Sequence, residues 1–305
     1  MTDSPNISVV MSVYNNQDTL PAALESVLSQ KGVELEFIAV NDGSTDRSAE
    51  ILDAAAARDS RLKIIHKKNE GLTRALIEGC SAASAPWIAR QDADDISMPG
   101  RLRAQLDRAL QSDSPVLISC GAVYRTPEGI ELFPVVPATD LNKKILEQIE
   151  SPCPHGAAFF SQSAYEAVGG YRPEFYYAQD LDLFTRLAKF GVVASVPDVL
   201  YAYTFSPYSI STHSSAMQNE FRELIARSDA AALQEASDLS QQIRAGAVRK
   251  ADPFAGLYFI GSCLLRKNSR EAAEYFRRAL AVRPCSVKTW LKLALALVRG
   301  GSTHE

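Results

Sequence analysis

The chain is poor in cysteine, and the few that it has form no metal-binding or redox motif. Its 305 residues include five cysteines, at positions 80, 120, 153, 263 and 285. A disulfide framework or a cysteine-based zinc site is recognised by closely spaced pairs, which this odd and scattered set does not provide. We therefore expect reduced thiols and a cytosolic protein.

Long apolar runs are also missing. No stretch is long enough to cross a bilayer, and the first residues, Met1 to Pro5, show no basic region followed by an apolar core. The sequence therefore predicts neither a transmembrane helix nor a signal peptide. We expect a cytoplasmic location, with peripheral association at the inner face of the cytoplasmic membrane as the alternative.

Excess positive charge is the third absence. The 32 Lys and Arg residues are outnumbered by 36 Asp and Glu residues, for a formal net charge of −4. General nucleic-acid binders are usually basic, so no nucleic-acid partner is expected. The hydrophobic content of 46% and the charged content of 22% are those of a globular protein with a real core.

What the chain does contain is a regular alternation of apolar strands and amphipathic helices. Continuous apolar runs predict strands, and residues at helical spacing predict a helix after each of the first three. The predicted strands are Ile7–Val13, Phe37–Val40, Leu62–His66 and Trp87–Ala89. This order is typical of an α/β protein with a parallel sheet, whose ligands bind at the carboxyl ends of the strands. Tyr14, Asp42 and Asp92 are thereby predicted to share one rim.

Three carboxylates, Asp92, Asp94 and Asp95, follow the fourth predicted strand within four positions. Like charges in a cluster repel each other and are costly to desolvate, so a compensating cation is expected. Oxygen ligands favour Mg²⁺ or Mn²⁺, which proteins often share with a phosphate group. The alternative for this segment alone is an acidic surface turn.

Four motifs together resemble the family 2 glycosyltransferases over roughly the first two-thirds of the chain. They are Val13-Tyr14-Asn15, Asn41-Asp42-Gly43-Ser44-Thr45-Asp46, Asn69-x-Gly71-Leu72 and Asp92-Ala93-Asp94-Asp95. The resemblance implies an inverting enzyme that uses nucleotide-activated sugars. It also implies a GT-A fold, a mostly parallel sheet flanked by helices, over residues 1–213. Residues 214–305 would form an all-α C-terminal extension.

A later segment extends the resemblance. Gln179-Asp180-Leu181-Asp182-Leu183 is similar to the family's Glu-Asp-x-Asp-Leu motif, with Gln in place of Glu, and Asp180 matches its catalytic base. The family often carries a His after the last strand of this domain, where this chain has Ser206. His213 lies farther on, and the sequence leaves open whether either residue takes that role.

The resemblance assigns a role to each candidate residue. Asp94 and Asp92 would hold the metal, with Asp180 as the general base. The nucleotide-sugar site would use Val13, Tyr14, Asn15, Asp42, Arg74, Asp92 and Ala93, and the acceptor side His155, Tyr177 and Gln179. Each has a plainer alternative: Asp42 as a turn former, Arg74 as a solvated cation, Asp180 as a helix cap, Tyr177 as a core residue and His155 as a hydrogen-bonded loop residue.

The C-terminal part is rich in Ala and Leu and is predicted to be helical. Two sets of residues have spacings that resemble one tetratricopeptide repeat and the start of the next: Ala272, Phe276, Ala279 and Pro284, then Trp290, Leu293 and Ala294. A single repeat cannot bury its own face, so we expect it to pack on the first domain, on a protein partner or on a second copy. An ordinary helical hairpin is the alternative.

The sequence therefore predicts a metal-dependent inverting glycosyltransferase, of hexosyl or hexosaminyl type, that uses Mn²⁺ or Mg²⁺. A UDP-sugar is the expected donor, a saccharide or lipid-linked hydroxyl the expected acceptor, and polysaccharide or cell-surface glycan synthesis the expected setting. One alternative is a sugar nucleotidyltransferase, which would carry a Gly-rich, basic loop where this chain has Tyr14-Asn15-Asn16. The other is a catalytically silent docking protein that uses the helical extension.

Overall fold

The computed structural model describes residues 4–207, 215–245 and 252–301. The chain divides into two compact units. Unit 1 comprises residues 1–123, 134–203 and 220–245, and unit 2 comprises residues 124–133, 204–219 and 246–305. The predicted domain boundary after residue 213 lies outside the described residues and stays a prediction.

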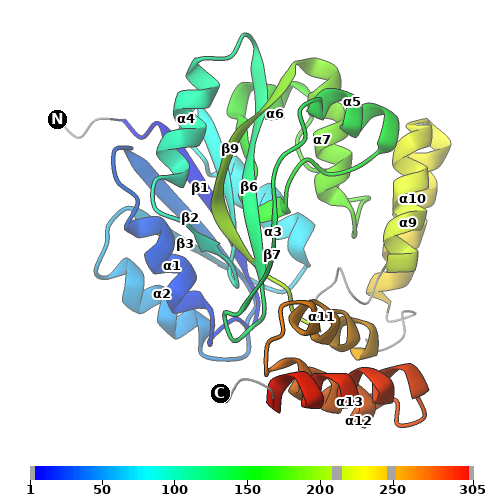
Figure 1. The fold of residues 1–305 in the computed structure, drawn as a ribbon. Coiled ribbons are helices and arrows are strands. Elements are labelled where there is room, and N and C mark those ends of the chain that lie inside the picture. Colours follow the sequence, from blue (N-terminus) through cyan, green and yellow to red (C-terminus); the bar gives the residue numbers. More distant parts are fainter. Residues whose placement is uncertain (1–3, 208–214, 246–251, 302–305) are drawn as a thin grey trace. The chain divides into compact units, whose positions relative to one another are not determined.

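Unit 1 begins with four strands joined by three helices (Figure 1). The strands are β1 (Ile7–Val13), β2 (Leu35–Asp42), β3 (Leu62–Lys67) and β4 (Trp87–Asp92); the helices are α1 (Leu20–Leu28), α2 (Ser48–Ala56) and α3 (Leu72–Ser81). β1 pairs in parallel with both β2 and β4, and β2 pairs in parallel with β3. The parallel α/β arrangement predicted from the apolar runs is confirmed.

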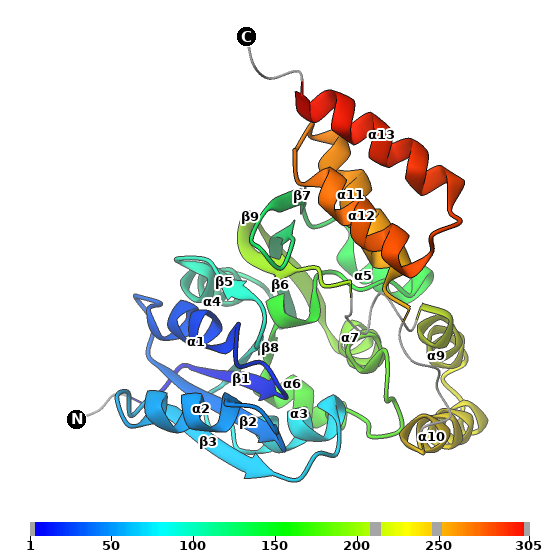
Figure 2. The same cartoon turned by 90° about the horizontal axis from the view of Figure 1, so that it is seen from below.

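The order of these strands reverses beside β1. The sheet runs β3, β2, β1, β4, so the chain moves outward from β1 to β3 and then returns to the far side of β1. Helices α1 and α2 lie side by side, whereas α3 packs on β1 and β2 (Figures 1 and 2). Because crossovers are right-handed, the reversal places α3 on the opposite face of the sheet from α1 and α2. Gly79 of α3 allows this close packing, since a Cβ there would lie 2.6 Å from Val10 Cγ1.

The remaining elements complete a mixed sheet. They are β5 (Ile96–Ser97), α4 (Arg101–Leu110), β6 (Pro115–Arg125), β7 (Glu131–Val135), α5 (Leu141–Gln148), a 3₁₀ turn (His155–Ala157), β8 (Phe159–Ser161), α6 (Gln162–Ala167), α7 (Gln179–Phe190) and β9 (Val192–Thr204). Within the described residues the strand order continues from β4 through β8, β6 and β9 to β5, and β7 pairs with β6. β8 is antiparallel to both β4 and β6, so the sheet is parallel on one side and antiparallel on the other.

The helical region contains α9 (Ser215–Arg227), α10 (Ala230–Arg244), α11 (Phe254–Arg266), α12 (Ala272–Val282) and α13 (Val287–Gly301). In unit 2, α11 to α13 share an apolar core with the strand residue Leu132. Ala272, Phe276 and Ala279 are fully buried in that core, whereas Trp290 on α13 is 55% exposed. The tetratricopeptide assignment itself stays a prediction. No helix in the described ranges is long and apolar enough to span a membrane.

Candidate active site

The site lies where the strand order reverses, at the carboxyl ends of β1 and β4. Ser12 of β1 pairs with Asp92 of β4, and Val13 pairs with Asn41 of β2. Tyr14, Asp42 and Asp92 therefore leave neighbouring strands at one edge, as predicted. A reversal point of this kind opens a crevice between the loops of the two halves of the sheet, which is where such sheets bind nucleotides.

The loops after β1 and β2 are bonded to each other. Asn15, whose φ is +55°, donates its backbone N–H to Ser44 Oγ at 3.1 Å and accepts the Thr45 N–H on its side-chain oxygen at 2.8 Å. The Asn16 N–H reaches Ser48 Oγ at 2.9 Å. Asn is one of the few residues that adopt positive φ readily, which explains its place in this turn. The turn leaves the Tyr14 ring 48% exposed beside the rim.

The Asp42 carboxylate orders the loop that leads into α3. Its two oxygens accept the backbone N–H groups of Glu70 and Gly71 at 2.9 and 2.8 Å, and the residue is 2% exposed. Tyr176 covers this loop, because a Cβ at Gly71 would lie 3.4 Å from its ring. Burial raises the pKa of Tyr176, Tyr177 raises it further, Arg244 opposes the shift, and the charge of Asp42 adds a smaller increase. Asp42 and Tyr176 therefore both border the loop at Gly71.

Arg74 stands in the first turn of α3 and is exposed. Its charge helps to lower the pKa of Glu70, after the larger effect of the hydrogen bond from Lys67 to that carboxylate. Arg74 is thus close to the loop held by Asp42 and open to solvent.

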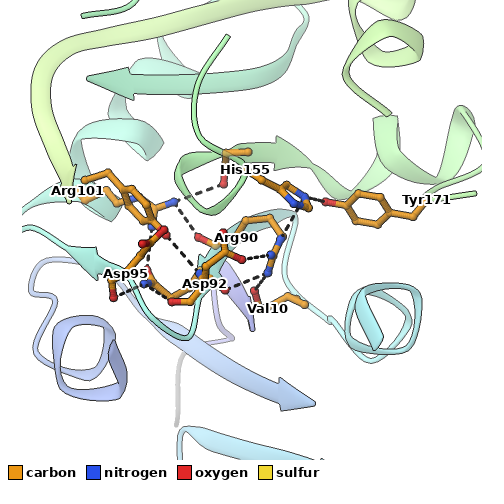
Figure 3. A network of polar contacts seen from close by, with 10 residues as sticks. Val10, Arg90, Asp92, Asp95, Arg101, His155 and Tyr171 are labelled. Atoms are coloured by element: carbon orange, nitrogen blue, oxygen red, sulfur yellow. Dashed lines mark hydrogen bonds and ion pairs between the residues drawn. The ribbon is translucent and has the colours of Figure 1, made fainter. Parts of the chain in front are cut away.

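A buried arginine supports the first carboxylate of the acidic cluster (Figure 3). Arg90 on β4 is 0% exposed, and its Nη2 donates to Asp92 Oδ1 at 2.6 Å. Its Nη1 donates to the carbonyl oxygens of Val10 and Gln91 at 2.6 and 3.0 Å. These hydrogen bonds offset the cost of desolvating the buried guanidinium, and one of them holds an oxygen of Asp92 in place. The protein itself supplies one cation to the carboxylate cluster.

A second buried arginine, Arg101 of α4, lies beneath the same turn. Its Nη2 donates to the Arg90 carbonyl at 2.9 Å, and its guanidinium carbon stacks 4.8 Å from the centre of the Tyr201 ring. The Asp92 N–H donates to the Tyr201 hydroxyl at 3.3 Å. Gly156 passes close by, since a Cβ there would lie 1.9 Å from Tyr201 Oη and 2.8 Å from Asp92 Oδ2. Only glycine fits at that position, so this packing fixes Asp92.

His155 joins the site from the 3₁₀ turn and is partly buried. Its Nε2 lies 2.7 Å from the Tyr171 hydroxyl and 3.4 Å from Arg90 Nε (Figure 3). Burial, and then the charge of Arg90, holds the pKa of His155 well below its ordinary value. The ring is neutral at pH 7, and its Nε2 accepts the Arg90 proton, which places the ring proton on Nδ1.

Asp180 reaches the same site from the start of α7. Burial raises the pKa of the Asp180 carboxyl; the charge of Asp92 raises it further, while backbone N–H groups and Arg90 oppose the shift. Asp180 also raises the pKa of Tyr171, although burial is the larger cause there. The carboxyl therefore shares its surroundings with Asp92, Arg90 and Tyr171. The N-cap position of α7 is Ala178, which makes no side-chain capping bond.

The other residues predicted for the acceptor side flank Asp180. Gln179 is 7% exposed, and Tyr177 is partly exposed with its ring packed edge-on against Tyr176 at 5.0 Å. Ser206 belongs to unit 2, and His213 lies outside the described residues. The roles of all four stay predictions.

The acidic turn also provides the oxygen ligands expected for a divalent cation. Ala93 is buried and its carbonyl accepts the Thr19 hydroxyl at 2.9 Å, which leaves Asp92 and Asp94 partly exposed on either side. The described residues contain no group of three or more His, Cys, Asp or Glu side chains that could hold a metal. Mg²⁺ is commonly held by one or two carboxylates together with substrate phosphates. The Asp92 and Asp94 pair fits that requirement.

Sequence reasoning missed the residues that position Asp92. Arg90, Tyr201 and Gly156 were absent from the predicted site because none of them belongs to a motif that the sequence analysis used. One signal was available: a basic residue at the end of an apolar strand, two positions before a cluster of carboxylates, is a candidate for an internal ion pair. Tyr201 and Gly156 had no such signal, since their proximity arises only from the sheet pairing.

The fold and this rim together define a glycosyltransferase of the GT-A-like α/β class. The family model "Glycosyl transferase family 2" matches residues 8–169, which is more than half of the chain. The chain belongs to glycosyl transferase family 2.

Similar proteins include a relative named as a glycosyltransferase and one named for succinoglycan biosynthesis. The glycosyltransferase EpsE of Bacillus subtilis is 33% identical over 198 residues, covering 63% of this chain and 69% of EpsE. The succinoglycan biosynthesis protein ExoO of Rhizobium meliloti is 39% identical over 106 residues, which is 34% of this chain and 30% of ExoO.

Solved structures share the fold at low sequence identity. The mannosyltransferase PcManGT of Pyrobaculum calidifontis, in complex with GDP-Man and Mn²⁺, has a TM-score of 0.56 at 17% identity, over 100% of this chain and 89% of that one. TarS 1–349 of S. aureus in complex with UDP has a TM-score of 0.56 at 15% identity, covering 98% and 93%. The GT-A-like fold predicted from the motifs is confirmed.

Proposed function

We propose that this glycosyltransferase moves a sugar from a nucleotide-diphosphate donor to a hydroxyl group of a saccharide or lipid-linked acceptor, with inversion at the anomeric carbon. Asp180 and Asp92 come from different elements that one packed network joins. The ring of Phe184, one turn after Asp180 on α7, packs edge-on at 6.1 Å against His155, and His155 lies 3.4 Å from Arg90, the partner of Asp92. This packing is the observation that carries the proposal. One carboxylate stands at the nucleotide rim and the other begins α7. A donor with its diphosphate near Asp92 would present its anomeric carbon between them.

Asp180 is the proposed general base. The acceptor hydroxyl loses its proton as it attacks, and a carboxylate with a raised pKa is a better proton acceptor than an ordinary aspartate. Attack from the Asp180 side, opposite the leaving diphosphate, inverts the anomeric centre. The neutral His155 ring and the Tyr171 hydroxyl hold Arg90 and its partner Asp92 in place during this step.

Asp94 is the proposed metal ligand, with Asp92 beside it. A bound Mn²⁺ or Mg²⁺ would neutralise the charge that develops on the diphosphate as it leaves. Arg90 occupies only one oxygen of Asp92, so the second remains available to the metal or to the ribose. Arg74, exposed in the first turn of α3, can pair with the diphosphate as well.

The nucleotide is proposed to lie over the loops after β1 and β2. Val13, Tyr14 and Asn15 would line the base, with the exposed Tyr14 ring available for stacking. Asp42 would accept from the base N–H, because each of its oxygens accepts one backbone N–H and a carboxylate oxygen can accept a second hydrogen bond. Ala93 would contact the sugar nucleotide through its backbone. UDP is the first nucleotide to test, with GDP and dTDP as alternatives.

A donor screen tests the proposal. Purified protein is offered UDP-, GDP- and dTDP-sugars with and without Mn²⁺, and release of the nucleoside diphosphate is measured. We expect metal-dependent turnover of at least one hexose or N-acetylhexosamine donor. Asp94→Ala should abolish that turnover, whereas Asp113→Ala, at an exposed position on the loop after α4, should leave it unchanged. Donor turnover that is equal in the Asp94→Ala variant would remove the metal assignment.

Peripheral membrane association is proposed through the outer face of α13. Val287 and Leu291 are 71% and 68% exposed there, and the helix contains basic residues but no acidic one. Two of its lysines, Lys288 and Lys292, lie over the Tyr258 ring of α11 at 4.8 and 4.6 Å. Exposed apolar side chains on a helix of net positive charge favour the interface of an anionic bilayer. This placement would bring the enzyme to lipid-linked acceptors and to the site of surface-polysaccharide synthesis.

Vesicle flotation tests the membrane proposal. We expect binding to vesicles that contain anionic phospholipid, weaker binding to zwitterionic vesicles, and loss of binding in Leu291→Asp. Leu110→Asp is the control, because Leu110 is equally exposed, at 72%, but lies on α4. The membrane proposal would be overturned if the protein did not bind vesicles. A dimer seen by analytical ultracentrifugation and lost in Leu291→Asp would then assign this face to a second copy of the chain.

A further inference from the structure

A small basic cavity lies on the side of α7 that faces away from the reaction site. It belongs to unit 1, has a volume of about 150 Å³, and is lined by side chains from α7, α9, α10 and the segment before α7 (elements labelled in Figure 2). Its polar lining residues include Arg172, Asp182, Thr185, Arg186 and Lys189. Asp180 and Asp182 are two positions apart, which separates them by about 200° around the helix axis.

The cavity carries a surplus of positive charge. Arg186, 12% exposed, binds Asp182 Oδ2 through its Nη2 at 2.5 Å, and Arg172 Nη1 lies 3.5 Å from Asp182 Oδ1. One carboxylate thus faces two guanidinium groups, and Lys189 adds a third cation to the lining. Asp182 is committed to Arg186, so Arg172 and Lys189 keep charge and N–H donors for another partner.

One lining hydroxyl has no protein partner. Thr185 is 3% exposed, and its Oγ1 is buried without a hydrogen bond. A buried hydroxyl left unpaired costs about 1–3 kcal/mol, so such groups in folded proteins usually bind something. Thr289 of α13 is the contrasting case, because it is 0% exposed and its Oγ1 lies 2.7 Å from Ser286 Oγ.

We propose that this cavity is a binding site for a phosphate group, held by Arg172, Lys189 and the Thr185 hydroxyl. Guanidinium, ammonium and hydroxyl donors that line one small cavity suit a tetrahedral oxyanion. The cavity is smaller than sites for drug-sized ligands, which take about 300–1,000 Å³, and so admits a phosphate rather than a whole nucleotide. The phosphate is either free in solution or the phosphomonoester end of a larger molecule.

Thermal unfolding and calorimetric titration of the full chain test this site. Inorganic phosphate and glycerol 3-phosphate are each titrated, with KCl at matched ionic strength to account for screening. A ligand that binds only the folded state raises the Tm. The variants are Thr185→Val and Lys189→Ala; the controls are Thr289→Val, a buried threonine whose hydroxyl is paired, and Lys31→Ala, an exposed lysine that does not line the cavity.

We expect a phosphate-dependent rise in Tm that the controls retain. Each variant should weaken binding about tenfold or more, as the loss of one hydrogen bond to a charged group predicts. Without ligand, Thr185→Val should raise the Tm, because it removes an unpaired hydroxyl, whereas Thr289→Val should lower it. A response to glycerol 3-phosphate alone would support the site and assign it to a phosphomonoester. Absence of any response, or a response equal in the variants, would overturn the proposal.

Discussion

The two faces of α7 provide different surroundings for two neighbouring carboxylates, Asp180 and Asp182. Asp182 forms an ion pair with Arg186 at 2.5 Å and a longer contact with Arg172 at 3.5 Å, on the face that lines the basic cavity. Asp180, on the other face, forms no ion pair with an arginine of the described residues, and burial together with the charge of Asp92 raises its pKa. The same residue type in one helix is therefore paired with arginine at one position and has a raised pKa at the other.

We therefore expect the two aspartates of this motif to have different roles, Asp182 in the stability of the fold and Asp180 in the reaction. A buried carboxylate near a second negative charge takes up a proton more readily than an ordinary carboxylate does. Perturbed carboxylates of this kind are candidates for acid–base catalysis. The comparison therefore predicts that equivalent substitutions at Asp180 and Asp182 give different defects.

The largest expected effect is on transfer by Asp180→Asn. Removal of a general base typically lowers the rate about 10²–10⁴-fold, and we expect a loss in that range. Donor affinity should stay close to that of the wild type, because Asp180 is proposed to contact the acceptor. The measurement pairs single-turnover transfer with calorimetric donor binding. Full transfer activity in this variant would remove the base assignment.

Asp182→Asn is expected to damage stability instead. The side chain is 5% exposed, and its loss as an anion leaves Arg186 without its charged partner, at a cost of about 3 kcal/mol. Denaturant unfolding should show this loss, while the folded fraction keeps its transfer rate. A stable Asp182→Asn variant with impaired transfer would reverse the assignment of the two faces.

Gly156→Ala tests the support of Asp92, whose charge acts on Asp180. The added methyl group would overlap Tyr201 Oη, so the 3₁₀ turn must shift, and overpacking of this kind costs about 1–3 kcal/mol. We expect kcat to fall as well. Gly261→Ala is the matched control, since its Cβ would meet Phe276 at 2.9 Å in unit 2. If Gly156→Ala and Gly261→Ala had the same kcat, the position of Asp92 would have no effect on the reaction.

The smallest expected effect is on the pH dependence of stability. The pKa of Asp180 is raised in the folded state, so ionisation of this carboxyl opposes folding. The stability that the protonated carboxyl contributes is fully present below the pKa of the unfolded state and is lost as the pH rises through the pKa of the folded state. Asp180→Asn should therefore raise the Tm at pH 7, and this gain should shrink as the pH falls below the raised pKa. The check is a series of melts from pH 3.5 to pH 7.5. A gain that is constant across this range would contradict a raised pKa.

The sequence predicted the parallel half of the fold well, because continuous apolar runs need no distant information. β1 matches its predicted bounds, Ile7–Val13. Farther along the chain, the apolar runs Val192–Val196 and Val199–Phe205 predict two strands divided at Pro197, whereas the structure has one strand, β9, that ends at Thr204. Proline can occupy a strand position that needs no N–H donor, and Pro197 is exposed. Pro127, Gly129, Pro134 and Pro137 likewise predict a loop-rich connection, but the structure forms strand β7 there, with Pro134 inside it.

For the site, the motifs located the carboxylates but not what holds them. β4 was predicted to end at Ala89, yet it continues to Asp92 because the Arg90 guanidinium finds buried acceptors on Val10 and Gln91. Those acceptors come together only through strand pairing, which local sequence does not encode. The same holds for Tyr201, which lies more than one hundred positions from its partner Asp92.

The central claim is that Asp180 and Asp92 share one electrostatic environment. The most direct test is an NMR titration of the Asp180 carboxyl in ¹³C-labelled wild-type protein and in Asp92→Asn. We predict a pKa above the ordinary aspartate value in the wild type, and a lower one in the variant, where a negative charge is gone and Arg90 remains. An Asp180 pKa that is unchanged by the substitution would contradict the account.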